Sequence, residues 1–353
     1  MNILIFFPSI DNGGPTNVVL SLLKGLNKNK NINIHAVYFW GDNDNNLDVI
    51  NSCCDSIYKL DKVNLKSLYK LLAIIKEIKP DIVHSHCLVP DFFNYILSLC
   101  YSYKSVSTLH CNLDEDYINE YGFIKSHSYK FIHKYILMKI NNVVSVSKSV
   151  LKAIPEVKAK TILNGIEELK TPLYKDNLDV INLLYVGRLI KRKNISFLIS
   201  CITEINKIRN KKIKLTIVGD GELKSILKIK SGKNISFIDF NDNPFACGVE
   251  NTFFINPSLS EGMPIAVLEA LSLGLPVLLS SIPAHIEIND KMTDGVQLFD
   301  FNFESINNAI ESMLIDCNNI GYRNKIKSQF QDNFSLNTMS DNYVLEYKLM
   351  LEG

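Results

Sequence analysis

The chain has 353 residues, of which 46% are hydrophobic and 21% charged, and its formal net charge is +1 at pH 7. This length favours two domains, and the composition is ordinary for a folded globular protein, which argues against a disordered or fibrous chain. A nearly balanced charge gives no overall attraction to nucleic acid, so we expect no nucleic-acid partner.

The sequence also indicates the cellular setting. Its eight cysteines are scattered without a CxxC pair, which argues against a disulfide or zinc framework and favours a reducing cytoplasm. The chain starts with a strand-like run at 3–7 rather than a signal peptide. No apolar run reaches the ~18 residues that a membrane span needs. We therefore expect a cytoplasmic protein.

The first half of the chain alternates short β-branched runs with helical patterns. Helices are expected at 18–26 and 65–78. Strands are expected at 3–7, 34–39, 57–60, 82–84, 105–109 and 143–146. This alternation is typical of a mainly parallel sheet with helices on both faces.

A polar stretch without periodicity, residues 167–179, follows and is interpreted as a linker. The second half then repeats the plan and ends in about three helices. Its strands are expected at 182–186, 214–218, 235–238, 252–255, 277–279 and 296–299. We expect two doubly wound α/β domains whose ligands bind at the carboxyl ends of the strands, with the active site in the cleft between the domains.

The segment from 256 to 276 combines a polar turn with the start of a helix. Pro264 suits a first helical turn, and Gly274 and Pro276 end the helix. Such a strand, glycine loop and helix N-terminus form an anion site. Glu261 and Glu269 would repel a bare phosphate there and are better suited to accept hydrogen bonds from hydroxyls. The segment therefore predicts a ligand that carries both phosphates and sugars.

Two further strand ends carry candidate binding residues. Arg188 follows Gly187 directly, and Lys193 lies five residues after the arginine, so the two cations could clamp a diphosphate. A solvated basic loop is an equally good interpretation of the same residues. The run Gly219-Asp220-Gly221 lets a ligand or another backbone come close, although an ordinary turn is the commoner case.

The N-terminal half offers a glycine pair and a group of histidines. Gly13-Gly14 is half of a dinucleotide fingerprint, but GxGxxG is absent, which disfavours a dehydrogenase. The His84-Ser85-His86 run and His110 follow two strands. Too few ligands are present for zinc, whereas His110 could hydrogen-bond a substrate hydroxyl or phosphate. For His84, a ring satisfied by neighbouring backbone is of comparable weight.

The helical pattern at 124–140 allows two interpretations. Its apolar residues share one face, and most of its basic residues share the other. The commoner case is a core-packing helix with a wet basic face. The alternative is contact with an anionic bilayer surface. We expected Ile124, Phe131, Ile132, Tyr135, Ile136 and Met138 to face the core, and His127, Lys130, His133 and Lys134 to face solvent.

Taken in order, these motifs resemble those of the large retaining glycosyltransferase family of GT-B fold that uses nucleotide-sugar donors (group 1, family 4 type). The resemblance runs nearly end to end and includes the two glutamates separated by seven residues, within a Ser-x-x-Glu-Gly-Met-Pro context. It rests on Gly13-Gly14, residues 81–86, His110, Asn164-Gly165, Gly187-Arg188 with Lys193, Gly219-Asp220-Gly221 and the pair Glu261 and Glu269.

The resemblance implies a role for each domain. Residues 1–165 would bind the acceptor and 166–334 the donor, while 335–353 would form a helix that returns to the first domain. The catalytic residues would be Arg188, Lys193, Glu261 and His110. The donor-binding residues would be Gly14, Arg188, Lys193, Gly219, Glu261, Gly262, Met263, Ile265, Ala266 and Glu269. Pro264 departs from relatives with glycine there and removes one amide from the set.

The function implied is transfer of a hexose or N-acetylhexosamine from a nucleotide diphosphate sugar to a sugar acceptor, with retention by front-face attack. The acceptor would be a surface polysaccharide or a lipid-linked glycan, reached from the inner face of the membrane. UDP is favoured by family frequency, and no cofactor or metal is expected because no suitably placed DxD run occurs. The alternatives are a nucleotide-sugar 2-epimerase of GT-B fold and a non-catalytic nucleotide-sugar-binding subunit.

Overall fold

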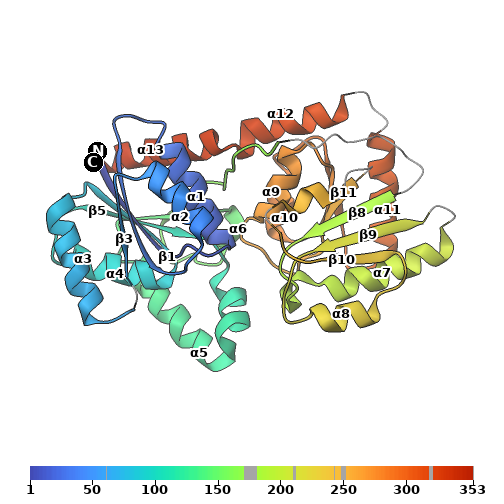
Figure 1. The fold of residues 1–353 in the computed structure, drawn as a ribbon, viewed down its shortest axis with the longest axis horizontal. Helices are drawn as coiled ribbons and strands as arrows, with labels where there is room; N and C mark the ends of the chain where they lie inside the picture. Colours follow the sequence, from blue (N-terminus) through green and yellow to red (C-terminus); the bar gives the residue numbers. More distant parts are fainter. Residues whose placement is uncertain are drawn as a thin grey trace. The chain divides into compact units, whose positions relative to one another are not determined.

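The computed structural model describes residues 1–60, 62–170, 181–209, 212–241, 243–247, 252–317 and 321–352, except for a few side chains between 115 and 124. The chain divides into two compact units (Figure 1). Unit 1 comprises Met1–Glu167 and Phe334–Gly353, and unit 2 comprises Glu168–Asn333. The expected linker at 167–179 lies mostly outside the described residues. Within the described part, no helix is both long and apolar enough to cross a bilayer.

Unit 1 is a parallel sheet covered by helices on both faces. Its strands are β1 (Asn2–Ser9), β2 (Asn33–Trp40), β3 (Ser56–Lys59), β4 (Ile82–His86), β5 (Lys104–Leu109), β6 (Asn142–Ser145) and β7 (Ala159–Thr161). Its helices are α1 (Gly14–Leu26), α2 (Asp44–Cys53), α3 (Leu65–Ile78), α4 (Leu88–Ser98), α5 (Leu113–Leu137), α6 (Lys148–Lys152) and α13 (Leu336–Glu352).

The strand order in unit 1 is β3-β2-β1-β4-β5-β6-β7, with every pairing parallel. Strands buried on both faces need continuous apolar runs, and the fully buried stretch from Ile3 to Phe7 in β1 is such a run. The order reverses between β1 and β4, which makes their carboxyl ends a topological switch point.

Unit 2 repeats this plan with six parallel strands. Its strands are β8 (Ile181–Val186), β9 (Ile213–Val218), β10 (Ile235–Ile238), β11 (Thr252–Asn256), β12 (Val277–Ser280) and β13 (Val296–Phe299). Its helices are η1 (Lys191–Lys193), α7 (Ile195–Ile208), α8 (Lys224–Lys230), η2 (Pro244–Cys247), α9 (Ile265–Ser272), α10 (Pro283–Asn289), α11 (Phe303–Asp316) and α12 (Tyr322–Phe334). The order β10-β9-β8-β11-β12-β13 places the switch point between β8 and β11. Two doubly wound parallel sheets confirm the predicted fold class.

The C-terminal helix α13 returns to unit 1 and packs along α1 (Figure 1). Gly25 of α1 permits this approach, because a Cβ there would lie 2.4 Å from Cβ of Ser340. Two buried tyrosines of α13 reach the sheet: the hydroxyl of Tyr347 lies 2.7 Å from Nδ1 of His84, and that of Tyr343 lies 2.8 Å from Oγ1 of Thr108. Paired polar groups of this kind fix how a helix sits on its sheet.

Helix α5 contradicts the core-packing interpretation of 124–140. Phe131, which we expected in the core, is three-quarters exposed, and Ile132, Tyr135 and Met138 are exposed as well. Conversely, His133, expected in solvent, is fully buried. Of the expected core residues with described side chains, Ile136 is buried, and the side chain of Ile124 lies outside the described part. Periodicity identifies an apolar face but not whether the protein covers it.

The return of the chain to unit 1 depends on close backbone contact at Gly165. A Cβ at this position would lie 2.2 Å from the carbonyl oxygen of Ser335. We therefore expect Gly165→Ala to lower the free energy of unfolding by about 1–3 kcal/mol, measured by urea denaturation. The control is Gly232→Ala, where an added Cβ meets nothing within 4 Å. Equal stability of the two variants would contradict the packing argument.

Candidate functional site

The predicted donor residues of unit 2 gather at its switch point. The loop after β8 carries Gly187, Arg188 and, in η1, Lys193, while the loop after β11 carries Glu261 and leads into α9. Since β8 and β11 are neighbours in the sheet, their carboxyl ends bring the two loops together. This is where open parallel sheets bind their ligands.

Gly219 and Gly221 are required by the packing of these loops. A Cβ on Gly219 would lie 2.0 Å from the carbonyl oxygen of Gly187, and one on Gly221 would lie 2.6 Å from that of Leu189. Both glycines also adopt positive φ angles, of 148° and 154°, which side chains disfavour. The run 219–221 therefore holds the β8 loop in place from the neighbouring strand. Packing within the protein is thus enough to explain why these two positions are glycines.

A buried ion cluster joins the two loops. Glu261 accepts a hydrogen bond from Arg192 at 2.9 Å and is also paired with the ammonium of Lys193. Arg192 donates a second bond, of 2.5 Å, to the carbonyl oxygen of Ser260, and the hydroxyl of Ser258 lies 2.7 Å from Glu261 Oε1. Two cations and one carboxylate leave this cluster with one net positive charge.

The pKa values express the strength of the cluster. Burial alone would raise the pKa of Glu261, but the charges of Lys193 and Arg192 lower it to about 2. Burial lowers the pKa of Lys193, and the opposing charge of Glu261 raises it. The charge of Arg188 also acts on Lys193, although Arg188 is exposed and makes no side-chain hydrogen bond with the described residues. Glu261 is thus ionised at every physiological pH, and Arg188 points its charge at solvent.

Sequence reasoning missed Arg192. The run Lys191-Arg192-Lys193 shows three adjacent cations and no sign of which one turns inward. The short helix η1 and the left-handed Asn194 that follows it decide this, because they turn the second and third cations toward Glu261 and leave Lys191 exposed. A basic triplet followed by Asn, a residue type that tolerates the left-handed conformation, is a weak sequence signal that one of the cations turns inward.

Behind the cluster, a buried polar network supports the Glu261 loop. The hydroxyl of Ser280 donates to the carbonyl oxygen of Ser258 at 2.6 Å, and Nδ1 of His285 lies 2.9 Å from the carbonyl oxygen of Ser280. Asn256 accepts from the amide of Ser258 at 3.1 Å. Buried polar groups paired in this way hold one loop conformation, so the carboxylate of Glu261 is positioned from two strands.

Glu269 lies in α9, and its carboxylate has no hydrogen-bond partner among the described residues. Burial raises its pKa to about 7. In the loop just before the same helix, Gly262 and Met263 are buried. First-turn amides such as those of Ile265 and Ala266 have no partner inside a helix. The α9 start therefore combines amide donors with a carboxylate that titrates near neutral pH.

In unit 1, Gly14 opens α1 directly after the β1 loop, at that unit's switch point. A Cβ there would meet nothing within 4 Å. Open space above a helix N-terminus allows a ligand to approach the backbone closely. The position fits the predicted binding of an anion by this loop.

Three of the histidines of unit 1, the buried His84 and His86 and the half-buried His110, form one group at the ends of β4 and β5. Nδ1 of His86 lies 2.9 Å from Nε2 of His110, and the rings of His84 and His86 are 4.3 Å apart. His84 is satisfied by the side chains of Thr108 and Tyr347 rather than by backbone. Burial lowers the pKa of His110 to about 4, so the ring is neutral at pH 7. Among the described residues no metal-binding group of three or more ligands occurs.

The tautomer of His110 follows from its neighbour. Nε2 of His86 is buried without a partner among the described residues, and an orphaned buried N–H is rarer than an orphaned acceptor. The proton of His86 is therefore assigned to Nδ1, which donates to Nε2 of His110. This leaves the proton of His110 on its own Nδ1, so the residue presents a neutral donor.

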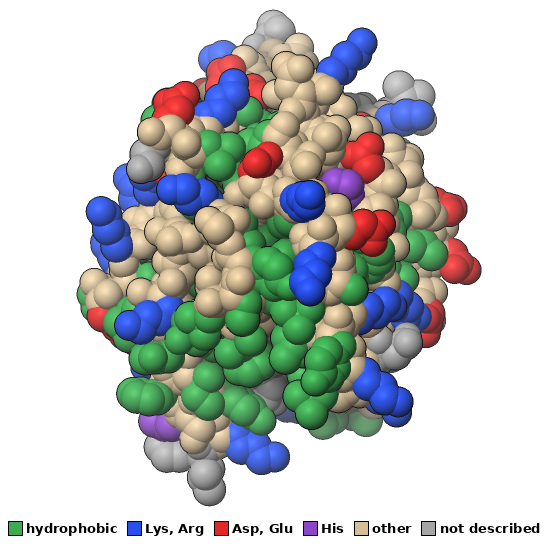
Figure 2. All heavy atoms as spheres, turned by 90° about the vertical axis from the view of Figure 1, so that its left-hand side faces the viewer, with side chains coloured by type: hydrophobic (Ala, Val, Ile, Leu, Met, Phe, Trp, Pro, Cys, Tyr) green, Lys and Arg blue, Asp and Glu red, His purple; other side chains and the backbone are tan. Residues whose placement is uncertain are grey.

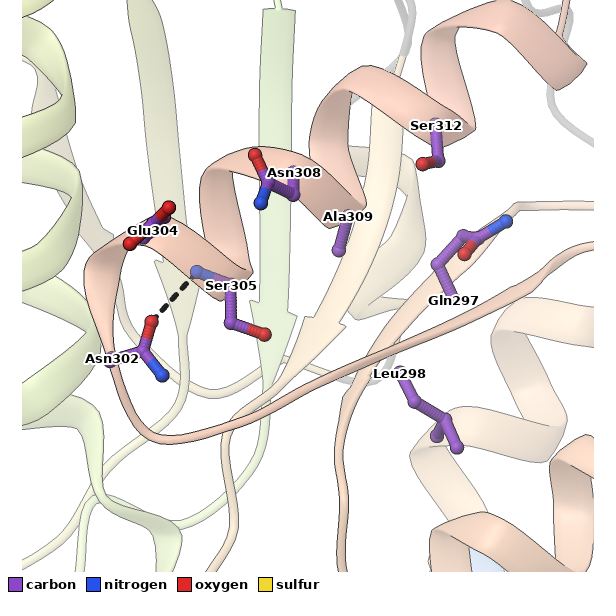
Figure 3. A pocket seen from close by; sticks show the side chains of 8 residues that line it. All are labelled: Gln297, Leu298, Asn302, Glu304, Ser305, Asn308, Ala309 and Ser312. Atoms are coloured by element: carbon purple, nitrogen blue, oxygen red, sulfur yellow. Dashed lines mark hydrogen bonds between the residues drawn. The ribbon is translucent and has the colours of Figure 1, made fainter.

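A polar pocket of about 390 Å³ lies elsewhere in unit 2, between β13 and the start of α11 (Figure 3). Asn302, at its rim, accepts a hydrogen bond of 2.8 Å from the amide of Ser305 (Figure 3) and so caps α11. Further polar residues of its lining are Gln297, Glu304, Asn308 and Ser312. None of the predicted site residues lines this pocket, which we interpret as a surface hollow beside a helix cap.

Comparison with known proteins links both units to one class of enzyme. Residues 12–168 match the family described as Glycosyltransferase Family 4, and residues 181–316 match Glycosyl transferases group 1. The O-antigen biosynthesis glycosyltransferase WclY of Escherichia coli is 27% identical, with 94% of this chain and 93% of the relative covered. The UDP-Gal:alpha-D-GlcNAc-diphosphoundecaprenol alpha-1,3-galactosyltransferase of Escherichia coli is 25% identical, with 80% of this chain and 79% of the relative covered.

Among solved structures, Anabaena HepE in complex with UDP and glucose superposes with a TM-score of 0.78. It is 15% identical and covers 99% of this chain and 100% of its own. A likeness at this identity concerns the fold, which both chains share from end to end.

The ion cluster makes stability depend on pH in a defined direction. The folded pKa of Glu261, about 2, lies below its usual 4.5. Its contribution to stability is therefore complete above pH 4.5 and is lost as pH falls toward 2. We expect Glu261→Gln to lower the free energy of unfolding at pH 7 by about 3–5 kcal/mol, because two buried cations lose their partner.

The measurement is urea denaturation at pH 7 and in steps between pH 4.5 and 3. The loss of stability on acidification should be smaller in Glu261→Gln than in the wild type. Glu222→Gln, which removes an exposed carboxylate of the same unit, is the control and should behave as the wild type. A wild-type stability at pH 7 in Glu261→Gln would contradict the structural role of the cluster.

Proposed function

The chain belongs to the group 1 glycosyltransferases of GT-B fold, and we propose that it transfers a hexose or N-acetylhexosamine from a UDP-sugar, with retention, to a lipid-linked glycan. Its relatives act in O-antigen biosynthesis and on a diphosphoundecaprenol-linked sugar. The matched transferase families support a transferase over the epimerase, and an enzyme over the non-catalytic subunit. The observation that carries the proposal is the pairing of net positive charge with an unpaired carboxylate at the unit 2 switch point.

Unit 2 would bind the donor through this charge. The diphosphate of a nucleotide sugar carries two negative charges. The ion cluster of Arg192, Lys193 and Glu261 has one net positive charge, and exposed Arg188 supplies a second. Preorganised cations of this kind stabilise the charge that develops on a departing diphosphate. The amides of Ile265 and Ala266 at the helix start would add donors to the same anion.

Glu269 is proposed to bind the ribose of the donor. An ionised carboxylate accepts hydrogen bonds from both hydroxyls of a vicinal diol, whereas protonation turns one of its oxygens into a donor and weakens this binding. The absence of a protein partner for Glu269 among the described residues, together with its raised pKa, supports a group that waits for a ligand. Gly219 would shape the loops, and Gly262 and Met263 the helix start, around that nucleotide.

The state of Glu261 limits the chemistry it can perform. A carboxylate with a pKa of about 2 that is held by two cations is a poor base and a poor nucleophile. We therefore propose front-face attack without a covalent intermediate. The bond from the sugar C1 to the diphosphate oxygen breaks, the acceptor oxygen bonds to C1 on the same face, and its proton passes to the departing phosphate.

Unit 1 would bind the acceptor. His110, neutral and carrying its proton on Nδ1, would donate a hydrogen bond to a sugar hydroxyl, and Gly14 would approach the anionic part of the substrates. No metal or further cofactor is proposed. Because the acceptor is carried on a lipid, we place the protein at the inner face of the cytoplasmic membrane as a peripheral enzyme.

Donor binding should depend on pH through Glu269. Its pKa of about 7 in the free protein must fall when ribose hydroxyls bind the ionised form. The Kd for UDP-glucose should therefore rise about tenfold for each pH unit below 7. The diphosphate of this probe does not titrate in that range. Isothermal calorimetry between pH 5.5 and 8 measures the effect.

Glu269→Gln should bind UDP-glucose more weakly at pH 8 and show no pH dependence, while Glu222→Gln should match the wild type. A flat wild-type profile would remove the ribose role of Glu269. The wild type could instead bind another nucleotide sugar and neither UDP-glucose nor other UDP-sugars. That result would reject UDP as the donor nucleotide and leave the transferase proposal standing.

A further inference from the structure

Helix α5 exposes a continuous apolar stripe, which we define as Phe131, Ile132, Tyr135 and Met138. Their exposed fractions are 75%, 45%, 45% and 50%. At 100° per residue these side chains span an arc of about 120°, which is wide for an uncovered apolar face. Soluble proteins rarely leave such faces uncovered unless they are used in binding.

The orientation of α5 is fixed by polar groups on its opposite side. Nε2 of His133 lies 2.7 Å from the carboxylate of Asp91 in α4, with both side chains fully buried. The hydroxyl of Tyr117 lies 2.6 Å from Nδ1 of the same histidine, and the two rings are stacked. Rotating α5 to bury the stripe would expose the histidine and leave Asp91 buried without its partner, which is costly. The exposure of the stripe is therefore built into the fold.

The apolar surface continues onto α4. The rings of Tyr95 and Tyr135 meet edge to face at 6.3 Å. Phe92 of α4 and Leu99, the residue after its last turn, are exposed as well. Figure 2, which views the molecule from the left-hand side of Figure 1, shows hydrophobic side chains gathered over the lower part of this face, with Lys and Arg side chains around them. The stripe is thus part of a patch that spans two helices.

The stretch of chain that carries the stripe has basic residues and no acidic ones. Residues 125–139 contain four lysines, two histidines and no acidic residue. Lys130 and Lys134 are paired with Asp114 and Glu156, but Lys125 and Lys139 are exposed, and the ammonium of Lys139 lies over the ring of Tyr135 at 5.6 Å. At 100° per residue, Lys125 lies within about 20° of Ile132 on the helix, and Lys139 follows just after α5 ends at Leu137.

We propose that the α4–α5 patch docks on the surface of an anionic lipid bilayer. Aromatic and aliphatic side chains would enter the interface while lysines contact anionic headgroups, the arrangement of an interfacial helix. The exposed Lys125 and Lys139 bound a stretch without acidic residues, and their charge complements an anionic surface. The inference rests on the proposed function, because a lipid-linked acceptor is presented at such a surface and α5 belongs to the proposed acceptor-binding unit.

The test is co-sedimentation of the full chain with vesicles of phosphatidylcholine alone and with 30% phosphatidylglycerol. The wild type should bind the anionic vesicles and bind less at high salt. Replacing Phe131 and Met138 together by Ser should weaken this binding at least tenfold, as should Lys125→Glu with Lys139→Glu. Ile229→Ser, at an apolar side chain of α8 that is 85% exposed, is the matched control and should bind as the wild type.

Calorimetry with UDP-glucose separates this inference from the proposed function. Stripe variants that retain wild-type donor affinity and lose vesicle binding support the inference. If the wild type does not bind anionic vesicles, or if the stripe variants bind them as strongly as the wild type, the inference is overturned, whatever the measured affinity for UDP-glucose. A stripe-dependent change of molar mass in light scattering without vesicle binding also overturns it, because the patch would then bind protein.

Discussion

The buried carboxylate of Glu261 is the group on which the architecture of the unit 2 switch point depends. It pairs with Arg192 and Lys193 and so ties the loop after β8 to the loop after β11. Each partner alone would be an uncompensated buried charge, which explains why the two loops close on one another. Because the carboxylate neutralises only one of its two cations, the cluster can fix the loops and still present positive charge to an anion. Structure and binding share the same residues for this reason.

A second buried pair decides what unit 1 presents to its surroundings. His133 and Asp91 hold α5 by its polar side, and the apolar stripe remains outside. Helix α13 is held in a related way, through tyrosine hydroxyls that reach His84 and Thr108 inside the sheet. In both helices, the polar contacts in the interior determine the orientation, and hydrophobic packing follows. The energetic cost of leaving a buried charge or hydroxyl without a partner is what makes these orientations unique.

Much of the fold was predictable because parallel strands are buried on both faces, so runs such as Ile3–Phe7 are apolar throughout. The strand β7 was not, since Ala-Lys-Thr carries no such run and pairs only along one edge. The outward face of α5 was only the less favoured interpretation and the role of Arg192 was missed, both for a common reason. Asp91 and His133 are 42 residues apart, and Arg192 and Glu261 are 69 apart, so no local pattern links them. Glu261 and Glu269 were identifiable from their spacing, but their different protonation arises from different neighbours.

The central claim is that exposed Arg188 binds the diphosphate directly, in addition to the net positive charge of the cluster in which Arg192 and Lys193 hold Glu261. Calorimetry of Arg188→Ala with UDP and with uridine tests it most directly. We predict at least a tenfold loss of UDP affinity, with the affinity for uridine and the urea midpoint unchanged, since the side chain of Arg188 is exposed and bonds to no described group. An equal loss for UDP and uridine, or no loss for UDP, would contradict the account.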